Sequence, residues 1–159
     1  MKRAMMLVLV LGLGSAANAG LVIEPVRWDM PSVDIAIAST GAITNFQFKI
    51  EVTEGTLSGE PVYPETWMFY PYVESRSDTH IAVMGGDFFE KAGPLAVLTG
   101  LRITFFGPAS YADLIATGRN YVDGIVITAG TVMDTLYAPE PMSVMLVGLG
   151  GLFLRSRRL

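Results

Sequence analysis

Hydrophobic and polar residues alternate along several short stretches of the chain, with the period of two that is typical of β-strands with one buried face. The clearest stretch is Phe46–Val52, in which the four even-numbered residues are apolar and the three residues between them are polar. Val33–Ala38 and Leu95–Phe106 show the same alternation. The sequence therefore predicts half-buried strands in these three places, each with one face on a core and one face in water.

Weaker patterns lie between and after these strands. Ser39–Ala42 has the composition of a turn, which predicts a hairpin joining the first two strands. His80–Met84 is predicted to be a strand that ends at Gly85-Gly86-Asp87, and Val122–Thr128 to be the last strand. Tyr111–Thr117 is short and apolar, and is predicted to form one helical turn.

Two segments are predicted to lack regular structure. Glu54–Pro71 contains three prolines, which forbid a continuous central strand, and is predicted to be a loop. Gly130–Tyr137 is predicted to be a short connection to the C-terminal end. Several short strands, turns rich in Gly and Pro and no long helical period favour an all-β fold, an antiparallel β-sandwich of the jelly-roll type over residues 20–136.

The N-terminal end has the three parts of a secretory signal peptide. Lys2 and Arg3 form a basic region, Ala4–Leu13 an apolar region, and Ala17-Asn18-Ala19 a small-x-small site before Gly20. The apolar region is too short to span a bilayer permanently. We therefore expect residues 1–19 to direct export and signal peptidase to cut between Ala19 and Gly20.

The C-terminal end, residues 137–159, has a different three-part pattern. Pro139-Glu140-Pro141 fixes an extended backbone, the apolar run Met142–Leu154 follows, and Arg155, Arg157 and Arg158 end the chain. As a helix, thirteen residues would span roughly 20 Å at about 1.5 Å per residue, whereas the hydrocarbon core of a bilayer is about 30 Å thick. The pattern predicts a marginal transmembrane helix with its arginines on the cytoplasmic side.

These residues resemble the PEP-CTERM protein-sorting signal, in which a Pro-Glu-Pro motif, one apolar helix and an arginine cluster follow an N-terminal signal peptide. The resemblance implies that the tail is recognised and removed by an exosortase, and that the protein belongs to the cell envelope or the extracellular matrix of a biofilm. The short helix departs from the family pattern. A plain single-pass anchor that is never cut is the alternative.

Charge and composition exclude several classes of function. The whole chain has a net charge of −4, but residues 20–136 contain six basic and fourteen acidic residues, which gives −8. Such a domain has no electrostatic basis for binding nucleic acid. The chain has no cysteine, so disulfides, thiolate metal sites and thiol nucleophiles are excluded.

The candidate chemical groups are few. His80 is the single histidine, with Asp78 two residues before it, and no third metal ligand is evident. Gly85-Gly86-Asp87 and Asn120…Asp123-Gly124 have oxygen atoms suited to calcium, but match no calcium motif, and turn formation explains them more simply. A Ser–His nucleophile would have to use His80. We predict no catalytic residue, no metal and no cofactor.

An aromatic cluster provides the best candidate binding surface. Trp67, Phe69, Tyr70 and Tyr72 lie close together in the proline-rich segment. Such side chains stack on sugar rings or anchor a partner protein. The alternative is that this segment folds back and covers an open end of the sandwich with its own aromatic rings.

The central segment also resembles cohesin-type β-sandwiches. The resemblance lies in Ile43-Thr44-Asn45-Phe46-Gln47-Phe48 and in Leu95–Phe106, which look like the paired strands of that family. It implies an extracellular sandwich that binds protein or glycan. We therefore expect a non-enzymatic interaction module at the cell surface, with an exopolysaccharide or a second surface protein as partner. A secreted hydrolase acting on polysaccharide and a permanently anchored structural protein are the alternatives.

Overall fold

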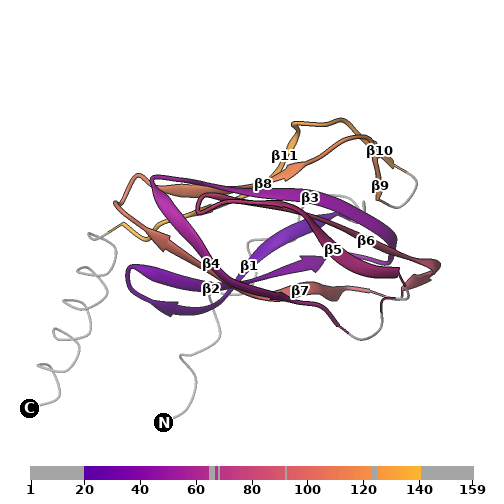
Figure 1. Ribbon diagram of the computed structural model, residues 1–159, viewed down its shortest axis with the longest axis horizontal. Helices are drawn as coiled ribbons and strands as arrows, with labels where there is room; N and C mark the ends of the chain where they lie inside the picture. Colours follow the sequence, from indigo (N-terminus) through magenta and orange to yellow (C-terminus); the bar gives the residue numbers. More distant parts are fainter. Residues whose placement is uncertain (1–19, 65–66, 68, 92, 123–124, 141–159) are drawn as a thin grey trace, which may run out of the picture.

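The computed structural model describes residues 20–140, apart from 65–66, 68, 92 and 123–124. The predicted signal helix and most of the predicted tail, including Pro141 and the apolar run, lie outside the described residues. The described chain folds into two antiparallel sheets packed face to face, with a small hairpin beside them (Figure 1). The all-β sandwich predicted from alternation is therefore confirmed.

The first sheet has four strands and the second has five. The first has the order β1-β2-β7-β4, with the bounds β1 Leu21–Asp29, β2 Ser32–Ser39, β7 Leu95–Phe105 and β4 Gly55–Val62. The second has the order β11-β8-β3-β6-β5, with the bounds β11 Val132–Tyr137, β8 Tyr111–Ala116, β3 Ile43–Thr53, β6 His80–Lys91 and β5 Phe69–Arg76. β9, Asn120–Val122, and β10, Ile125–Ile127, form the separate hairpin.

The core lies between the two sheets and is built by the alternation seen in the sequence. In β3 the side chains of Phe46, Phe48, Ile50 and Val52 are buried, and Glu51 on the other face is exposed. The same rule places Val33, Ile35 and Ile37 of β2 and most odd-numbered apolar residues of β7 in the core. Without disulfides, the burial of these side chains provides the main stabilisation of the domain.

The pairing corrects the predicted hairpin between the first two strands. β2 pairs with β7 in the four-stranded sheet, whereas β3 pairs with β6 and β8 in the other sheet. The turn at residues 40–42 therefore carries the chain from one sheet to the other. The sequence of two successive strands does not show whether they hydrogen-bond within one sheet or face each other from two sheets. Both arrangements bury the same alternate residues.

Three segments predicted to be irregular or helical are strands. The proline-rich segment holds β4 and the start of β5, the predicted helical turn is β8, and the predicted connection before the tail contains β11. In addition, β6 does not stop at Gly85-Gly86-Asp87 but continues to Lys91. β8 was missed because two of its three buried positions are Ala112 and Ala116, with Leu114 between them, and small side chains weaken the alternation.

The prolines of the strands lie at sheet edges. Pro25 is in β1, Pro61 in β4 and Pro71 in β5, and each of these strands is the outermost of its sheet. An edge position is where a residue without an N–H donor is tolerated. Proline is thus absent from the central strands of both sheets, as expected, but it does not prevent a segment from forming an edge strand.

One end of the sandwich, which we call the exit end, is where the described chain stops (left in Figure 1). It contains the turn between β1 and β2, the turn between β3 and β4, the connection from β7 to β8 and the end of β11. Ala138 follows β11, is buried, and donates its backbone N–H to the carbonyl of Ser110 at 2.9 Å. The folded domain thus extends slightly past the predicted boundary at residue 136.

Candidate functional site

The outer face of the five-stranded sheet is the candidate site. Residues directly opposite each other in antiparallel strands share a face, so the register places Lys49 beside Ile115 and Ala82, and Glu51 beside Asp113 and His80. A further row joins Gln47, Met84 and Tyr72. This outer face therefore mixes charged, apolar and aromatic side chains.

The β9–β10 hairpin borders this face. The Asn120 side chain is buried, and its Nδ2 donates to the Gln47 carbonyl of β3 at 2.7 Å. β9 therefore lies beside β3 beyond the point where β8 ends, and the hairpin stands off the sheet (Figure 1). This bond gives Asn120 a structural role in placing the hairpin against β3. Asp123 and Gly124, which were considered with it for calcium, lie outside the described residues.

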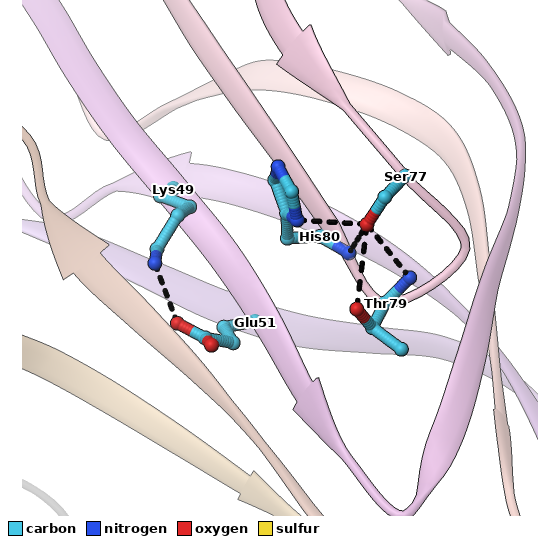
Figure 2. A network of polar contacts seen from close by, with 5 residues as sticks. All are labelled: Lys49, Glu51, Ser77, Thr79 and His80. Carbon is cyan, nitrogen blue, oxygen red and sulfur yellow. Dashed lines mark hydrogen bonds and ion pairs between the residues drawn. The ribbon is translucent and has the colours of Figure 1, made fainter.

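Figure 2 shows the polar groups at the centre of the face. Lys49 Nζ lies 2.5 Å from Glu51 Oε2, so one cation and one anion of the same strand neutralise each other. Both side chains are partly exposed, so this ion pair contributes little to stability. Glu51, Glu74 and Asp113 outnumber Lys49 on this face, which gives it an excess of negative charge.

His80 and Ser77 form the second polar group of Figure 2, at the turn between β5 and β6. Ser77 Oγ lies 2.7 Å from His80 Nδ1, and the same oxygen accepts the backbone N–H groups of Thr79 and His80, each at 3.2 Å. A serine three residues from its histidine in a tight turn, with its oxygen taken by two N–H donors, is a turn cap. The contact between Ser77 and His80 is therefore interpreted as stabilising the turn and not as activating a serine nucleophile.

The candidate metal ligands do not come together. Asp78 lies in the β5–β6 turn, where its carbonyl accepts the N–H of Leu57 at 2.6 Å. Asp87 is buried in β6, and its carboxylate contacts Lys91 Nζ at 2.7 Å and the N–H of Phe89 at 3.1 Å. Across the ranges that the structure describes, no three His, Asp or Glu side chains gather as a metal site would need.

The aromatic residues of the predicted binding surface lie in different places. Trp67 is 4% exposed and packs edge-on against Phe46 with the ring centroids 5.1 Å apart. Tyr72 is 54% exposed on the outer face of β5. Phe69 and Tyr70 lie at the start of β5. Trp67 thus packs into the core, as the alternative interpretation expected for a segment that folds back, whereas Tyr72 belongs to the candidate face.

The outer face of the four-stranded sheet is built differently. Its centre is an ion pair in which Arg102 Nε lies 2.6 Å from Asp34 Oδ1, and Ser32 Oγ lies 2.8 Å from Thr104 Oγ1 beside it. The hydrogen bond from Arg102 is the main cause that holds the pKa of Asp34 below the usual 3.8; desolvation opposes it, and the charges of Arg102 and Arg27 lower the pKa by smaller amounts. The polar side chains at the centre of this face thus bond to one another across neighbouring strands.

An apolar hollow of about 190 Å³ lies at the exit end. It is lined by Met30, Pro31, Phe105, Phe106, Gly107, Pro108, Ala138 and Pro139. None of these is acidic, so the hollow lacks the two carboxylates that glycoside hydrolysis needs. Glu140 of the predicted sorting motif is exposed directly after it, and Pro141 lies outside the described residues.

Sequence reasoning missed two features of these surfaces. Asp113 and Ile115 were not placed on the candidate face because their strand was read as helical, although the burial of alternate residues in β8 is regular. The exit hollow was missed because its lining comes from three segments that lie far apart in the sequence. Among the residues that the structure describes, no helix is long and apolar enough to cross a membrane.

Comparison with known proteins gives similarity at the level of the fold. No protein-family model and no curated protein sequence matches this chain. A type III cohesin module from the cellulosomal ScaE cell-surface anchoring scaffoldin of Ruminococcus flavefaciens superposes with a TM-score of 0.52 at 8% identity, over 77% of this chain and 87% of that one. A non-cellulosomal cohesin from the hyperthermophilic archaeon Archaeoglobus fulgidus gives 0.48 at 10% identity, over 76% and 91%. The domain therefore has a cohesin-like fold.

Proposed function

We propose that this protein is an exported, non-enzymatic interaction module, which binds a partner at the cell surface through the outer face of the five-stranded sheet. The observation that carries the proposal is the cohesin-like sandwich, because the similar module of Ruminococcus flavefaciens belongs to a cell-surface anchoring scaffoldin. A fold alone does not determine function. The mixed surface around Lys49, Glu51 and Tyr72 is what supports the choice of face.

The chemistry of this face suits a protein partner with a basic patch. Exposed Tyr72 offers an aromatic anchor of the kind enriched in protein interfaces. The surrounding carboxylates of Glu51, Glu74 and Asp113 favour a partner of opposite charge, and complementary charge raises association rates and specificity. The opposite sheet offers no comparable anchor at its centre, where Asp34 and Arg102 are already paired.

Site-specific photo-crosslinking tests this assignment in the native host. A photoreactive phenylalanine analogue replaces Tyr72 in one variant and Val62 in a matched control, because Val62 is 57% exposed on β4 of the other sheet. We expect a discrete adduct from position 72 and none from position 62. A protease-sensitive adduct identifies a protein partner, and a protease-resistant one an exopolysaccharide. Equal labelling at both positions would reject the proposed face.

We further propose that Pro139, Glu140 and Pro141 are the recognition motif of a PEP-CTERM sorting tail. Signal peptidase removes residues 1–19, the apolar run pauses in the membrane, and an exosortase then cuts the tail. The motif follows the folded domain directly, since Ala138 is buried and Glu140 is exposed, and an exposed extended backbone is what a protease binds. The cell envelope, followed by the cell surface, is the proposed location.

The intact mass of the mature protein from its native host tests both cuts together. We expect a mass that lacks residues 1–19 and the basic end Arg155–Leu159. A mature protein that starts at Gly20 but keeps its last residue would instead establish the permanent single-pass anchor. The exit hollow does not support the hydrolase alternative, because it is lined without a carboxylate.

A further inference from the structure

We propose that the exit end of the sandwich rests on the surface of the lipid bilayer while the tail is inserted. The contact rests on the function proposed above, because the tail must enter the membrane for the exit end to reach it. The partner is the lipid surface itself, through its interfacial layer, rather than a second protein.

The exit end carries a group of exposed apolar side chains. Phe106 is 69% exposed, Tyr137 68%, Met30 55% and Trp28 40%. Trp28 stacks on Phe105 with the ring centroids 6.4 Å apart, and Phe105, Phe106 and Met30 line the exit hollow. Apolar surface that gathers at one end, around a hollow without charged lining, marks an interaction site.

The chain itself holds this end near the membrane. The backbone is fixed as far as Ala138 by its hydrogen bond to Ser110. Only residues 139–141 separate Ala138 from the apolar run that starts at Met142. Extended chain covers at most about 3.6 Å per residue, so the reach is on the order of 14 Å. Once the apolar run is inserted, the exit end cannot stand far above the bilayer.

The shortness of the apolar run draws the domain closer. Thirteen helical residues span roughly 20 Å, against about 30 Å of hydrocarbon, and a short span is accommodated by thinning of the bilayer and by flanking residues that enter the interface. The headgroup layers add about 5–8 Å on each side of the hydrocarbon. A domain at the start of such a span therefore lies in or against this layer.

The side chains at this end suit the interfacial layer. Trp and Tyr gather at the boundary between lipid and water, where one end of the ring is apolar and the other hydrated. Trp28 and Tyr137 meet this requirement. The exposed charges nearby are Arg27, Asp29, Glu54 and Glu140, which are mostly acidic. The contact therefore depends on apolar insertion rather than on anionic lipid, and salt should change it little.

Depth-dependent quenching of tryptophan fluorescence tests the proposal, since the chain has one tryptophan at the exit end and one in the core. The chain without its signal peptide but with its tail, residues 20–159, is reconstituted in phosphatidylcholine vesicles with or without bromine near the top of the acyl chains. Trp67→Phe leaves Trp28 as the reporter, and Trp28→Phe leaves Trp67 as the internal control. We expect bromine to reduce Trp28 emission by about half, as for an interfacial residue, and to leave Trp67 emission unchanged.

A second pair of variants tests the apolar surface and does not require Trp67→Phe to fold. Phe106→Ser and Phe89→Ser each remove a phenylalanine that is 69% exposed, but Phe89 lies in β6, away from the residues that line the hollow. In the chain with both tryptophans, we expect Phe106→Ser to lower the quenching and Phe89→Ser to leave it unchanged. Equal effects of the two substitutions would overturn the proposal.

Resistance of the chain to alkaline carbonate extraction measures insertion of the tail separately. Inserted tail with unquenched Trp28 overturns the bilayer contact and leaves the proposed sorting tail in place. A tail that fails to insert overturns both. A blue shift of Trp28 emission that depends on residues 141–159 and appears without vesicles would show that the tail occupies the exit hollow, which also overturns the contact.

Discussion

Ser110 connects separate parts of the chain at the exit end. Its buried Oγ accepts the N–H of Gly107 at 3.1 Å and donates to the carbonyl of Glu54 at 3.0 Å, and its own carbonyl accepts the N–H of Ala138. One small side chain thus joins the β3–β4 turn to the β7–β8 connection. The last residue of the folded domain is tied to the same position.

Ser110→Ala is expected to destabilise the domain, because it leaves the Gly107 N–H without its acceptor. A buried polar group that loses its partner costs about 1–3 kcal/mol. Urea denaturation followed by fluorescence measures the change. Ser58→Ala is the control, because the Ser58 hydroxyl is exposed on β4 and its loss should cost less than about 0.5 kcal/mol. Equal costs for the two variants would contradict the role of Ser110.

Asp34 and Arg102 predict a pH dependence. Because the folded pKa of Asp34 lies below the usual 3.8, ionised Asp34 adds stability above pH 3.8, and this contribution is lost as the pH falls through the folded pKa. Asp34→Asn should therefore be less stable than the parent at pH 6, and the gap should close below pH 3.8. Carboxyl NMR titration should show a normal Asp34 pKa in Arg102→Gln. An unchanged pKa in that variant would exclude Arg102 as the cause.

Tyr63 provides a test of an unpartnered polar group. Its hydroxyl is buried with no hydrogen-bond partner among the described residues, and burial raises the pKa of its phenol. Removing such a hydroxyl breaks no hydrogen bond, and it removes the free-energy cost of burying an unpaired polar group. Tyr63→Phe should therefore be as stable as the parent protein, or more stable, in urea denaturation. A loss of more than about 1 kcal/mol, the usual worth of one hydrogen bond, would reveal a partner.

At the scale of elements, the backbones of the paired strands β4 and β7 approach each other closely at two glycines. Gly59 and Gly100 both have positive φ, 87° and 84°. A Cβ on Gly59 would lie 2.2 Å from the Gly100 carbonyl oxygen, and one on Gly100 would lie 2.4 Å from the Glu60 carbonyl oxygen. Both obstacles are backbone atoms, which cannot turn aside. The edge strand thus reaches its bulge only because neither residue has a side chain.

Gly59→Ala should destabilise the sandwich by more than the cost of the backbone conformation alone, which is about 1–3 kcal/mol. Gly130→Ala measures that cost, because Gly130 has a φ of 81° and no atom lies within 4 Å of its added Cβ. Thermal unfolding of the two variants gives the comparison. Equal losses would show that the approach of the two backbones does not limit this position.

The elements that could be predicted from the sequence are those with large side chains on the buried face. β3 alternates aromatic or branched residues with polar ones, so its faces are predicted correctly. In β7 the prediction holds from Leu101 to Phe105 but not at Leu98, which is buried next to buried Val97. β8 has alanine at two of its three buried positions, and β4 and β5 contain proline, so the local pattern favoured other structures. Which sheet a strand joins depends on contacts between residues that are distant in the sequence, and the local alternation of apolar and polar residues carries no information about those contacts.

At the scale of the whole molecule, the two outer faces are expected to differ in function. Glu51→Lys reverses a charge on the candidate face, and Asp34→Lys does so on the opposite face. We expect the first to weaken partner binding by about tenfold, equivalent to the loss of roughly 1.4 kcal/mol, and the second to leave it unchanged. Titration with the partner captured at position 72 measures both. Equal weakening would point to long-range charge rather than to one face.

The domain boundary could be predicted only approximately. Ala138 is buried and bonded to Ser110, so a fragment of residues 20–140 should be more stable in urea than one of residues 20–136. A fragment that ends at 136 loses that bond and the end of β11. Equal midpoints would place the end of the domain before β11 is complete. The aromatic segment shows the same limit, because the sequence could not tell that Trp67 faces Phe46 while Tyr72 faces outward.

The prolines at the sheet edges have a consequence for the behaviour of many copies together. An unprotected outer strand presents free N–H and C=O groups to which another chain can add, and this is a common route to fibres. Pro25, Pro61 and Pro71 interrupt that row of donors in three of the four outermost strands. We expect these prolines to oppose edge-to-edge pairing between neighbouring copies of the sandwich.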